Sequence, residues 1–189
     1  SPLLLLIALA IRLDSQGPVL LRQTRVGRRG RLFTCYKFRT MVSNADPELH
    51  RRYMRAFIHN QVPASAALTG DAAFKLVNDP RVTRAGRVLR RTSLDELPQL
   101  LNVLRGDMSL VGPRPALPYE VAEYEAWHCH RLEALPGLTG WWQVYGRSRV
   151  SFDEMVRMDI DYIAHQSLAL DMKLIMLTVP VVLLRRGAR

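Results

Sequence analysis

Two adjacent carboxylates, Asp95 and Glu96, lie among arginines near the middle of this chain. Arg90 and Arg91 precede them, and Arg114 follows, held between two prolines. Guanidinium groups match the geometry of phosphate oxygens, whereas carboxylates suit a hard divalent cation or nucleophilic attack on phosphorus. Acid pairs are common on solvated helix faces, so the density of cations around this pair is the informative part. The combination indicates chemistry at a phosphoryl group.

Local sequence predicts that the acid pair begins a helix. Ser93 and Glu96 have the spacing of a capping box, which places Asp95 at the second helical position. Four arginines upstream recur at every third position, so a helix would place them on roughly one face. They are Arg81, Arg84, Arg87 and Arg90. We expect the last two of these, and the neighbouring Arg91, to help bind substrate phosphates.

A helix N-terminus would favour the ionised form of Asp95. Free backbone N–H groups and the helix dipole stabilise an anion there, and Arg90 and Arg91 add to this effect. Two neighbouring carboxylates repel each other, and Mg²⁺ on Glu96 would relieve that repulsion while polarising a diphosphate. Asp95 is therefore the candidate nucleophile and Glu96 the candidate metal ligand. The spacing alone fits equally well a Glu96 that only completes the capping box.

Arg114 lies in the sequence Gly112-Pro113-Arg114-Pro115. Proline fixes the backbone on both sides of the arginine, so its guanidinium can be aimed at a ligand with little loss of entropy on binding. A solvated arginine in a rigid loop is the alternative. We favour phosphate binding.

Positive charge is concentrated in the first half of the chain. Residues 1–94 carry 17 Lys and Arg against 5 Asp and Glu, a net charge of +12, whereas residues 95–189 carry 10 against 12, a net charge of −2. The segment from Arg22 to Arg39 holds six Arg and one Lys, Lys37, without an acidic residue. A solvated edge strand is one explanation. We favour a surface that faces anions: a phosphorylated substrate, anionic lipid or nucleic acid.

An apolar run from Leu3 to Ile11 follows Ser1-Pro2 at the start of the sequence. It is far shorter than the roughly 20 residues that span a bilayer, and it lacks the flanks of a signal peptide. A core helix is one interpretation. We favour a half-helix inserted in a membrane and entered through the Ser-Pro break. Since the sequence has no initiator Met, we expect it to begin inside a longer protein.

The remaining pattern predicts one compact α+β domain, mainly helical, with a short β-hairpin and amphipathic helices at a membrane interface. The hairpin spans 19–39 and turns at Arg28-Arg29-Gly30. The apolar segment 167–184 is either a helix lying in the interface plane or a buried core helix. Further predicted elements are helix 46–60, loop 61–80, helix 119–134 and a helix that opens with a capping box at Ser151.

Five blocks of sequence are spaced along the chain: Lys37–Met41, Asp79–Gly86, Thr92–Asn102, Gly106–Pro115 and Pro136–Gly140. In this order they resemble the bacterial sugar transferases, the monotopic polyprenyl-phosphate phosphoglycosyl transferases. The similarity covers nearly the whole chain, and its central blocks are highly specific. The segments Ser151–Asp159 and Thr178–Leu183 look like the larger exopolysaccharide-type members, in which transmembrane helices and a further domain precede the catalytic part.

The resemblance implies transfer of a sugar-1-phosphate from a UDP-sugar to polyprenyl (undecaprenyl) phosphate, with release of UMP. This reaction would be the first membrane step of exopolysaccharide or glycoconjugate synthesis. The resemblance also implies Mg²⁺ dependence and a covalent phosphosugar intermediate on Asp95, with Glu96 as the metal ligand. Arg90 and Arg114 match positions that contact phosphate.

Lys37 and Arg39 fall within a further motif of the family, and we expect them to contact substrate phosphates as well. The resemblance divides the chain into a remnant of a re-entrant membrane helix, residues 1–13, and a catalytic domain, residues 14–189. It places this domain on the cytoplasmic face of the inner membrane, at the inner leaflet. A homo-oligomer is a further expectation.

A second hypothesis is a non-catalytic basic module that binds an anionic membrane surface or nucleic acid. The charge of residues 1–94 motivates it, and it predicts salt-sensitive binding without turnover of a UDP-sugar. Aromatic residues do not alternate with the cations of the hairpin as base-stacking platforms would. Nucleic acid is therefore not an expected partner, and we favour the transferase.

Overall fold

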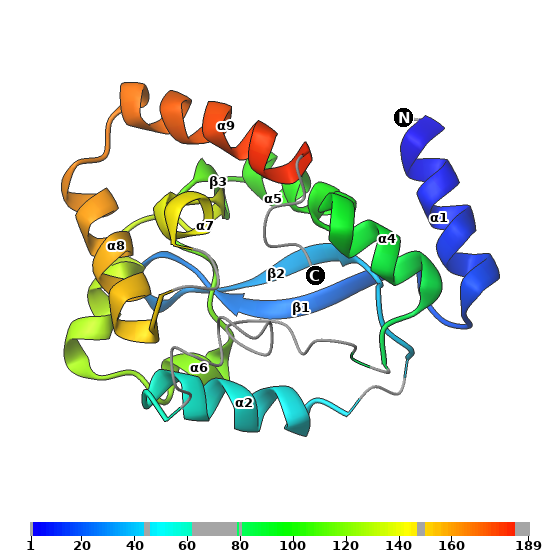
Figure 1. Ribbon diagram of the computed structural model, residues 1–189, viewed down its shortest axis with the longest axis horizontal. Helices are drawn as coiled ribbons and strands as arrows, with labels where there is room; N and C mark the ends of the chain where they lie inside the picture. Colours follow the sequence, from blue (N-terminus) through cyan, green and yellow to red (C-terminus); the bar gives the residue numbers. More distant parts are fainter. Residues whose placement is uncertain (1, 44–45, 62–78, 80, 147–149, 184–189) are drawn as a thin grey trace.

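A central β-hairpin is surrounded by helices in the computed structural model, which describes residues 2–43, 46–61, 79, 81–146 and 150–183 (Figure 1). The strands β1 (Leu20–Val26) and β2 (Leu32–Phe38) pair antiparallel, with Leu20 opposite Phe38. This mixed, mainly helical architecture confirms the predicted α+β class. The loop predicted over 61–80 lies outside the described residues except at its positions 61 and 79.

The hairpin turns where the sequence predicts, at the 3-10 helix η1 (Arg28–Gly30). The backbone N–H of Gly27 donates to the carbonyl of Arg31 at 2.7 Å and closes the turn. Arg29 has a φ of 56°, in the left-handed region that residues with a side chain seldom adopt. The turn therefore places a group of exposed arginines at one end of the hairpin.

Helix α1 (Pro2–Asp14) packs against α4 (Arg84–Thr92) beside the open end of the hairpin (Figure 1). Their shared apolar cluster consists of Ile7, Ile11, Phe38 and Leu89. At the end of α1, the carboxylate of Asp14 accepts a hydrogen bond from the backbone N–H of Ala85 at 2.8 Å. Asp14 thus satisfies one of the free donors in the first turn of α4.

Helix α4 begins at Thr83, whose hydroxyl accepts a hydrogen bond from the backbone N–H of Gly86 at 3.0 Å. It ends at Ser93, which has a φ of 56°. The capping box predicted at Ser93 is therefore wrong, because an N-cap residue needs extended backbone geometry and Ser93 is instead the left-handed end of the preceding helix. Its side chain makes no cap hydrogen bond, and Glu96 has a different partner.

The acid pair lies in the 3-10 helix η2 (Leu94–Gln99), which continues directly into α5 (Leu100–Leu104). A fully buried side chain, Asn102, ties this segment to the hairpin. Its Nδ2 donates to the carbonyl of Thr34 at 2.7 Å, and its Oδ1 accepts from the N–H of Tyr36 at 3.1 Å. The amide takes the place of a neighbouring strand along β2 and so fixes η2 beside it.

A short parallel pair, β3 (Ser109–Val111) and β4 (Gly137–Thr139), brings two of the sequence blocks together. The N–H of Gly112 donates to the carbonyl of Thr139 at 2.9 Å and extends the pairing toward Arg114. The sequence did not predict these strands, because segments of three residues carry too little periodicity to be recognised.

The single helix predicted over 119–134 is wrong. The chain instead forms a four-residue helix, α6 (Pro118–Val121), and a separate 3-10 helix, η3 (Ala126–Glu133). Glu125, between them, has extended backbone geometry and begins η3, with its N–H donating to Nδ1 of His128 at 3.0 Å. This local hydrogen bond interrupts the apolar periodicity from which one long helix was inferred.

The largest apolar cluster lies between α2 (Glu48–Ile58), α7 (Trp141–Tyr145) and α8 (Phe152–Ala164). Its fully or nearly buried members are Met54, Phe57, Ile58, Trp142, Phe152, Met155 and Val156. The capping box predicted at Ser151 is confirmed: its hydroxyl accepts from the N–H of Glu154, whose carboxylate accepts from the N–H of Ser151 at 2.7 Å.

Exposed apolar side chains are also found outside the core on α1, α5 and α9 (Leu168–Leu183). In Figure 1, α9 runs along the top of the view, α5 lies below it and α1 is at the right. Exposed members include Leu5, Leu6, Leu9, Leu101, Leu104, Leu168, Met172 and Met176. Within the described ranges, none of the helices combines the length and the hydropathy that crossing a bilayer would require. We name this set of exposed side chains the apolar face.

Candidate active site

The acid pair lies directly beside the hairpin. Nζ of Lys37 on β2 is 2.7 Å from Oε1 of Glu96 on η2, and the two side chains are only 17% and 28% exposed. This ion pair depends on Asn102, since that side chain sets the position of η2 along β2. Lys37 and Glu96, which are 59 positions apart in the sequence, are thereby brought into direct contact.

Lys37 and Glu96 line a small pocket to which Arg114 also contributes. Other lining residues are Arg25, Gln99 and Gln143. Three cations thus line the same pocket as Glu96, and this excess of positive charge suits an anionic ligand. The free volume of the pocket is about 10 Å³, so a large substrate can enter only when the lining side chains move.

Asp95 lies next to Glu96 in η2 and is partly buried. Burial lowers the pKa of Arg90, and the negative charges of Asp95 and Asp79 oppose this lowering. Nε of Arg90 donates to the hydroxyl of Thr40 at 2.9 Å, and this bond anchors the guanidinium just after the end of β2. Arg90 therefore interacts electrostatically with the candidate nucleophile.

Arg39 lies deeper in the molecule than its neighbour Lys37 and is only 5% exposed. Its Nη2 donates to the carbonyl of Ser15 at 2.8 Å, and its Nη1 donates to the carbonyl of Gln16 and, at 2.9 Å, to the hydroxyl of Ser43. These bonds hold the segment after α1 against the end of β2. Phosphate binding by Arg39 stays a prediction.

Arg87 and Arg91 are exposed on α4 and do not belong to the lining of the pocket described above. Nη1 of Arg87 donates to the carbonyl of Val82 at 3.4 Å. The N–H of Ala85 lowers the pKa of Asp14, and the positive charge of Arg87 adds to this effect. The structure therefore shows Arg87 at the contact between α1 and α4, and its role toward substrate phosphates stays a prediction, as does that of Arg91.

Arg25 is a site residue that sequence reasoning did not single out. It is 6% exposed, and its Nη1 donates to the carbonyl of Pro115 at 2.9 Å, while Nε and Nη2 donate to Oε1 of Gln23. Burial and the nearby charge of Arg114 both lower the pKa of Arg25. The sequence showed a basic hairpin, but it held no signal for which arginine turns inward.

The donor chemistry of the site fits Mg²⁺. Glu96 offers a partly exposed carboxylate at the pocket, and Asp95 lies beside it. In the part of the chain that the structure describes, no group of three or more His, Cys, Asp or Glu could hold a metal. Mg²⁺ is commonly bound by one or two carboxylates together with substrate phosphates and water. The residues therefore suit an ion shared between the protein and a bound diphosphate.

The resemblance suggested a family, and comparison with known sequences confirms it. The chain belongs to the bacterial sugar transferase family, whose model matches residues 1–185.

Two similar proteins are the galactosyl transferase CpsE of Streptococcus agalactiae serotype III, 47% identical over 95% of this chain, and an undecaprenyl-phosphate galactose phosphotransferase of Salmonella typhimurium, 45% identical over all of it. The exopolysaccharide production protein ExoY of Rhizobium meliloti is 42% identical, also over the full chain.

The relatives differ in how much of their own length they share with this chain. It spans 37% of the streptococcal protein and 38% of the Salmonella protein, but 80% of the Rhizobium protein. The chain thus spans less than two fifths of two of these relatives and four fifths of the third.

Proposed function

We propose that the protein transfers a sugar-1-phosphate from a UDP-sugar to undecaprenyl phosphate and releases UMP. The single observation that carries the proposal is the acid pair of η2, in which Glu96 shares a pocket with Lys37 and Arg114 while Asp95 interacts with Arg90. Membership of the family and the name of the Salmonella relative support the same reaction.

The proposed reaction has two displacement steps at phosphorus. In the first step, a carboxylate oxygen of Asp95 attacks the phosphorus that carries the sugar. A bond forms between that oxygen and phosphorus, the bond to the bridging oxygen breaks, and UMP leaves with the electron pair. In the second step, an oxygen of undecaprenyl phosphate attacks the same phosphorus. The bond to Asp95 breaks, the carboxylate is regenerated, and the product is a polyprenyl diphosphate sugar.

The surrounding cations orient the diphosphate and stabilise its charge in both steps. Arg114 is positioned by the extension of the β3–β4 pair, and Lys37 reaches the pocket from β2. Arg90 interacts electrostatically with Asp95 and places a positive charge near the nucleophile. Mg²⁺ held by Glu96 would polarise the diphosphate and neutralise part of its charge.

The acceptor is a lipid, so the site must work at a membrane surface. We propose that the apolar face lies against the cytoplasmic leaflet of the inner membrane, with α1 inserted and α9 in the plane of the interface. In this arrangement the catalytic residues face the cytoplasm, where UDP-sugars are available, and the reaction begins exopolysaccharide or glycoconjugate synthesis.

Release of UMP tests the proposal directly. The protein would be incubated with undecaprenyl phosphate and a panel of UDP-sugars, with and without Mg²⁺. We expect turnover with at least one sugar, dependence on Mg²⁺, and loss of activity by at least about 10³-fold in Asp95→Asn, because an amide is not a nucleophile toward phosphorus.

The matched control is Asp161→Asn, which makes the same chemical change at an exposed position of α8. We expect its activity to stay within twofold of wild type. Mass spectrometry of protein mixed with the UDP-sugar alone should detect a phosphosugar adduct that Asp95→Asn lacks. Turnover by Asp95→Asn at the wild-type rate would refute the assignment of the nucleophile, and an inactive wild type with every sugar would refute the reaction.

A further inference from the structure

A second pocket lies at the tip of the hairpin, away from the acid pair. Its volume is about 260 Å³, and no residue that lines it also lines the pocket of Lys37 and Glu96. From Phe33, which lines the tip pocket, to Lys37 the strand advances about 13 Å at 3.3 Å per residue. The tip pocket is thus spatially separate from the proposed site of phosphoryl transfer.

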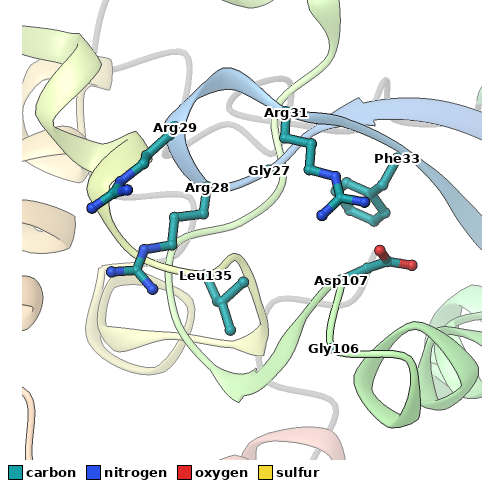
Figure 2. Close-up of a pocket in the computed structure, with 8 residues that line it drawn as sticks. All are labelled: Gly27, Arg28, Arg29, Arg31, Phe33, Gly106, Asp107 and Leu135. Atoms are coloured by element: carbon teal, nitrogen blue, oxygen red, sulfur yellow. The ribbon is translucent and has the colours of Figure 1, made fainter.

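Arginines dominate the rim of the tip pocket. Arg28, Arg29 and Arg31 of the hairpin turn contribute to its lining. Figure 2 shows Arg28 and Arg31 on two sides of the pocket, while Arg29 points outward. Among the described residues, none of the three makes a salt bridge with a carboxylate within 4.0 Å. Their charge is therefore available to a ligand.

Hydrogen bonds fix the backbone of the turn and the side chain of Arg28. The N–H of Arg31 donates to the carbonyl of Arg28 at 3.2 Å, and Nε of Arg28 donates to the carbonyl of Glu133 at 3.0 Å. The second bond links the hairpin to the end of η3 and leaves the two terminal nitrogens of Arg28 for another acceptor. This preorganisation of Arg28 reduces the entropy lost when an anion binds.

The other walls of the pocket define what else the ligand carries. Asp107 contributes one carboxylate, drawn just below Arg31 in Figure 2, and Leu135 and Phe33 provide apolar surface. A carboxylate accepts hydrogen bonds from hydroxyl groups but repels a phosphate. The volume lies just below the roughly 300 Å³ at which drug-sized ligands begin to fit. The pocket thus suits a small molecule that carries both a phosphate and hydroxyl groups.

We infer that the tip pocket binds a phosphate ester flanked by hydroxyl groups, with Arg28 and Arg31 on the phosphate and Asp107 on the hydroxyls. Two sources share this chemistry: a soluble metabolite, and the headgroup of a glycerol-bearing phospholipid. The inference concerns a site outside the catalytic pocket and does not depend on the proposed transfer reaction.

Binding of two probes distinguishes the sources. Calorimetry at low ionic strength would measure binding of glycerol 3-phosphate, and flotation would measure binding to phosphatidylglycerol vesicles relative to phosphatidylcholine vesicles. We expect saturable binding in one of these two arms. In that arm, Arg28→Gln and Arg31→Gln should each weaken binding about tenfold, since each removes a charge-assisted hydrogen bond.

The matched control is Arg22→Gln, which removes an exposed arginine of the same hairpin outside the pocket. Its affinity should stay within twofold of wild type. Arg31→Gln is the key variant. The side chain of Arg31 makes no hydrogen bond or salt bridge with the described residues, so its replacement should leave the fold intact. Asp107→Asn should weaken glycerol 3-phosphate binding while strengthening binding of inorganic phosphate.

Loss limited to the pocket variants in the soluble arm would support a metabolite site, and the same loss only in the vesicle arm would support a headgroup site. The inference is overturned if Arg22→Gln weakens binding as much as Arg28→Gln and Arg31→Gln, because the hairpin would then act only as a diffuse positive surface. Absence of saturable binding in both arms would also overturn it.

Discussion

Glu96 has a cationic partner at 2.7 Å in Lys37, although the proposed reaction needs this carboxylate as a metal ligand. The two roles are compatible when Lys37 holds Glu96 in place without substrate and turns to a phosphate once the diphosphate arrives. The ammonium group is a point charge on a flexible stem, so it can change partners more easily than a guanidinium fork. The ion pair therefore competes with the metal for Glu96.

This competition gives a prediction for Lys37→Gln. Removing the ammonium group should strengthen Mg²⁺ binding about threefold to fivefold, since a partly buried ion pair contributes about 1 kcal/mol. Calorimetric titration with MgCl₂ in the absence of substrate measures this effect. Lys173→Gln, an exposed lysine of α9, is the matched control for the loss of one positive charge. Unchanged or weaker Mg²⁺ binding in Lys37→Gln would contradict Glu96 as the metal ligand.

Helix α4 positions Arg90 only because it approaches the end of the hairpin very closely. A Cβ atom on Gly86 would lie 2.1 Å from the backbone oxygen of Thr40, and Thr40 also accepts the side-chain hydrogen bond of Arg90. The glycine is needed for close approach rather than for an unusual φ. The contact between α4 and this backbone is what keeps Arg90 near Asp95.

Gly86→Ala should therefore destabilise the protein, although the same change in an exposed helix stabilises by about 1 kcal/mol. We expect a loss of roughly 1–3 kcal/mol in the free energy of unfolding, as for overpacking, because the colliding atom belongs to the backbone. Urea denaturation measures this loss. Ala85→Gly, one position earlier, reports the contribution of helix propensity alone. A more stable Gly86→Ala protein would show that α4 does not contact Thr40 as described.

At the scale of the whole molecule, the apolar face and the basic hairpin form two distinct surfaces. The first includes exposed side chains of α1, α5 and α9, and the second is centred on the arginines of η1. In the proposed reaction, the lipid acceptor reaches Asp95 from the apolar side, whereas the UDP-sugar is soluble. The proposed reaction thus needs a molecule that lies on a membrane with its acid pair near the boundary.

The apolar face predicts binding to uncharged membranes. Leu101→Gln combined with Leu104→Gln should reduce the partition onto phosphatidylcholine vesicles by roughly tenfold or more, because each leucine inserted into lipid contributes on the order of 1 kcal/mol. Val42→Gln is the matched control: Val42 is 45% exposed and Leu101 is 47% exposed, but Val42 lies between β2 and α2. Equal effects of both changes would remove the case for a membrane-facing surface on α5.

Much of this protein could be predicted from its residues one segment at a time. The hairpin with its turn at Arg28–Gly30, the helix at Ser151 and the helical segment after Ser167 all follow from short-range rules. Turn residues, capping spacing and apolar periodicity act within a few positions of the chain, so the sequence alone carries them. The blocks around Asp95 likewise indicate the family by residue type and spacing alone, and the family match confirms it.

Tertiary structure decided which of many similar residues serve the site. Arg25 and Arg39 are both buried arginines of the hairpin segment that donate to backbone carbonyls, yet only Arg25 of the two lines the pocket. The sequence predicted Ser93 as an N-cap, but it ends the preceding helix. The short strands β3 and β4 are stabilised by pairing with each other rather than by a local sequence pattern. Long-range pairing and the direction of each side chain depend on the packing of distant segments, and no local pattern encodes these contacts.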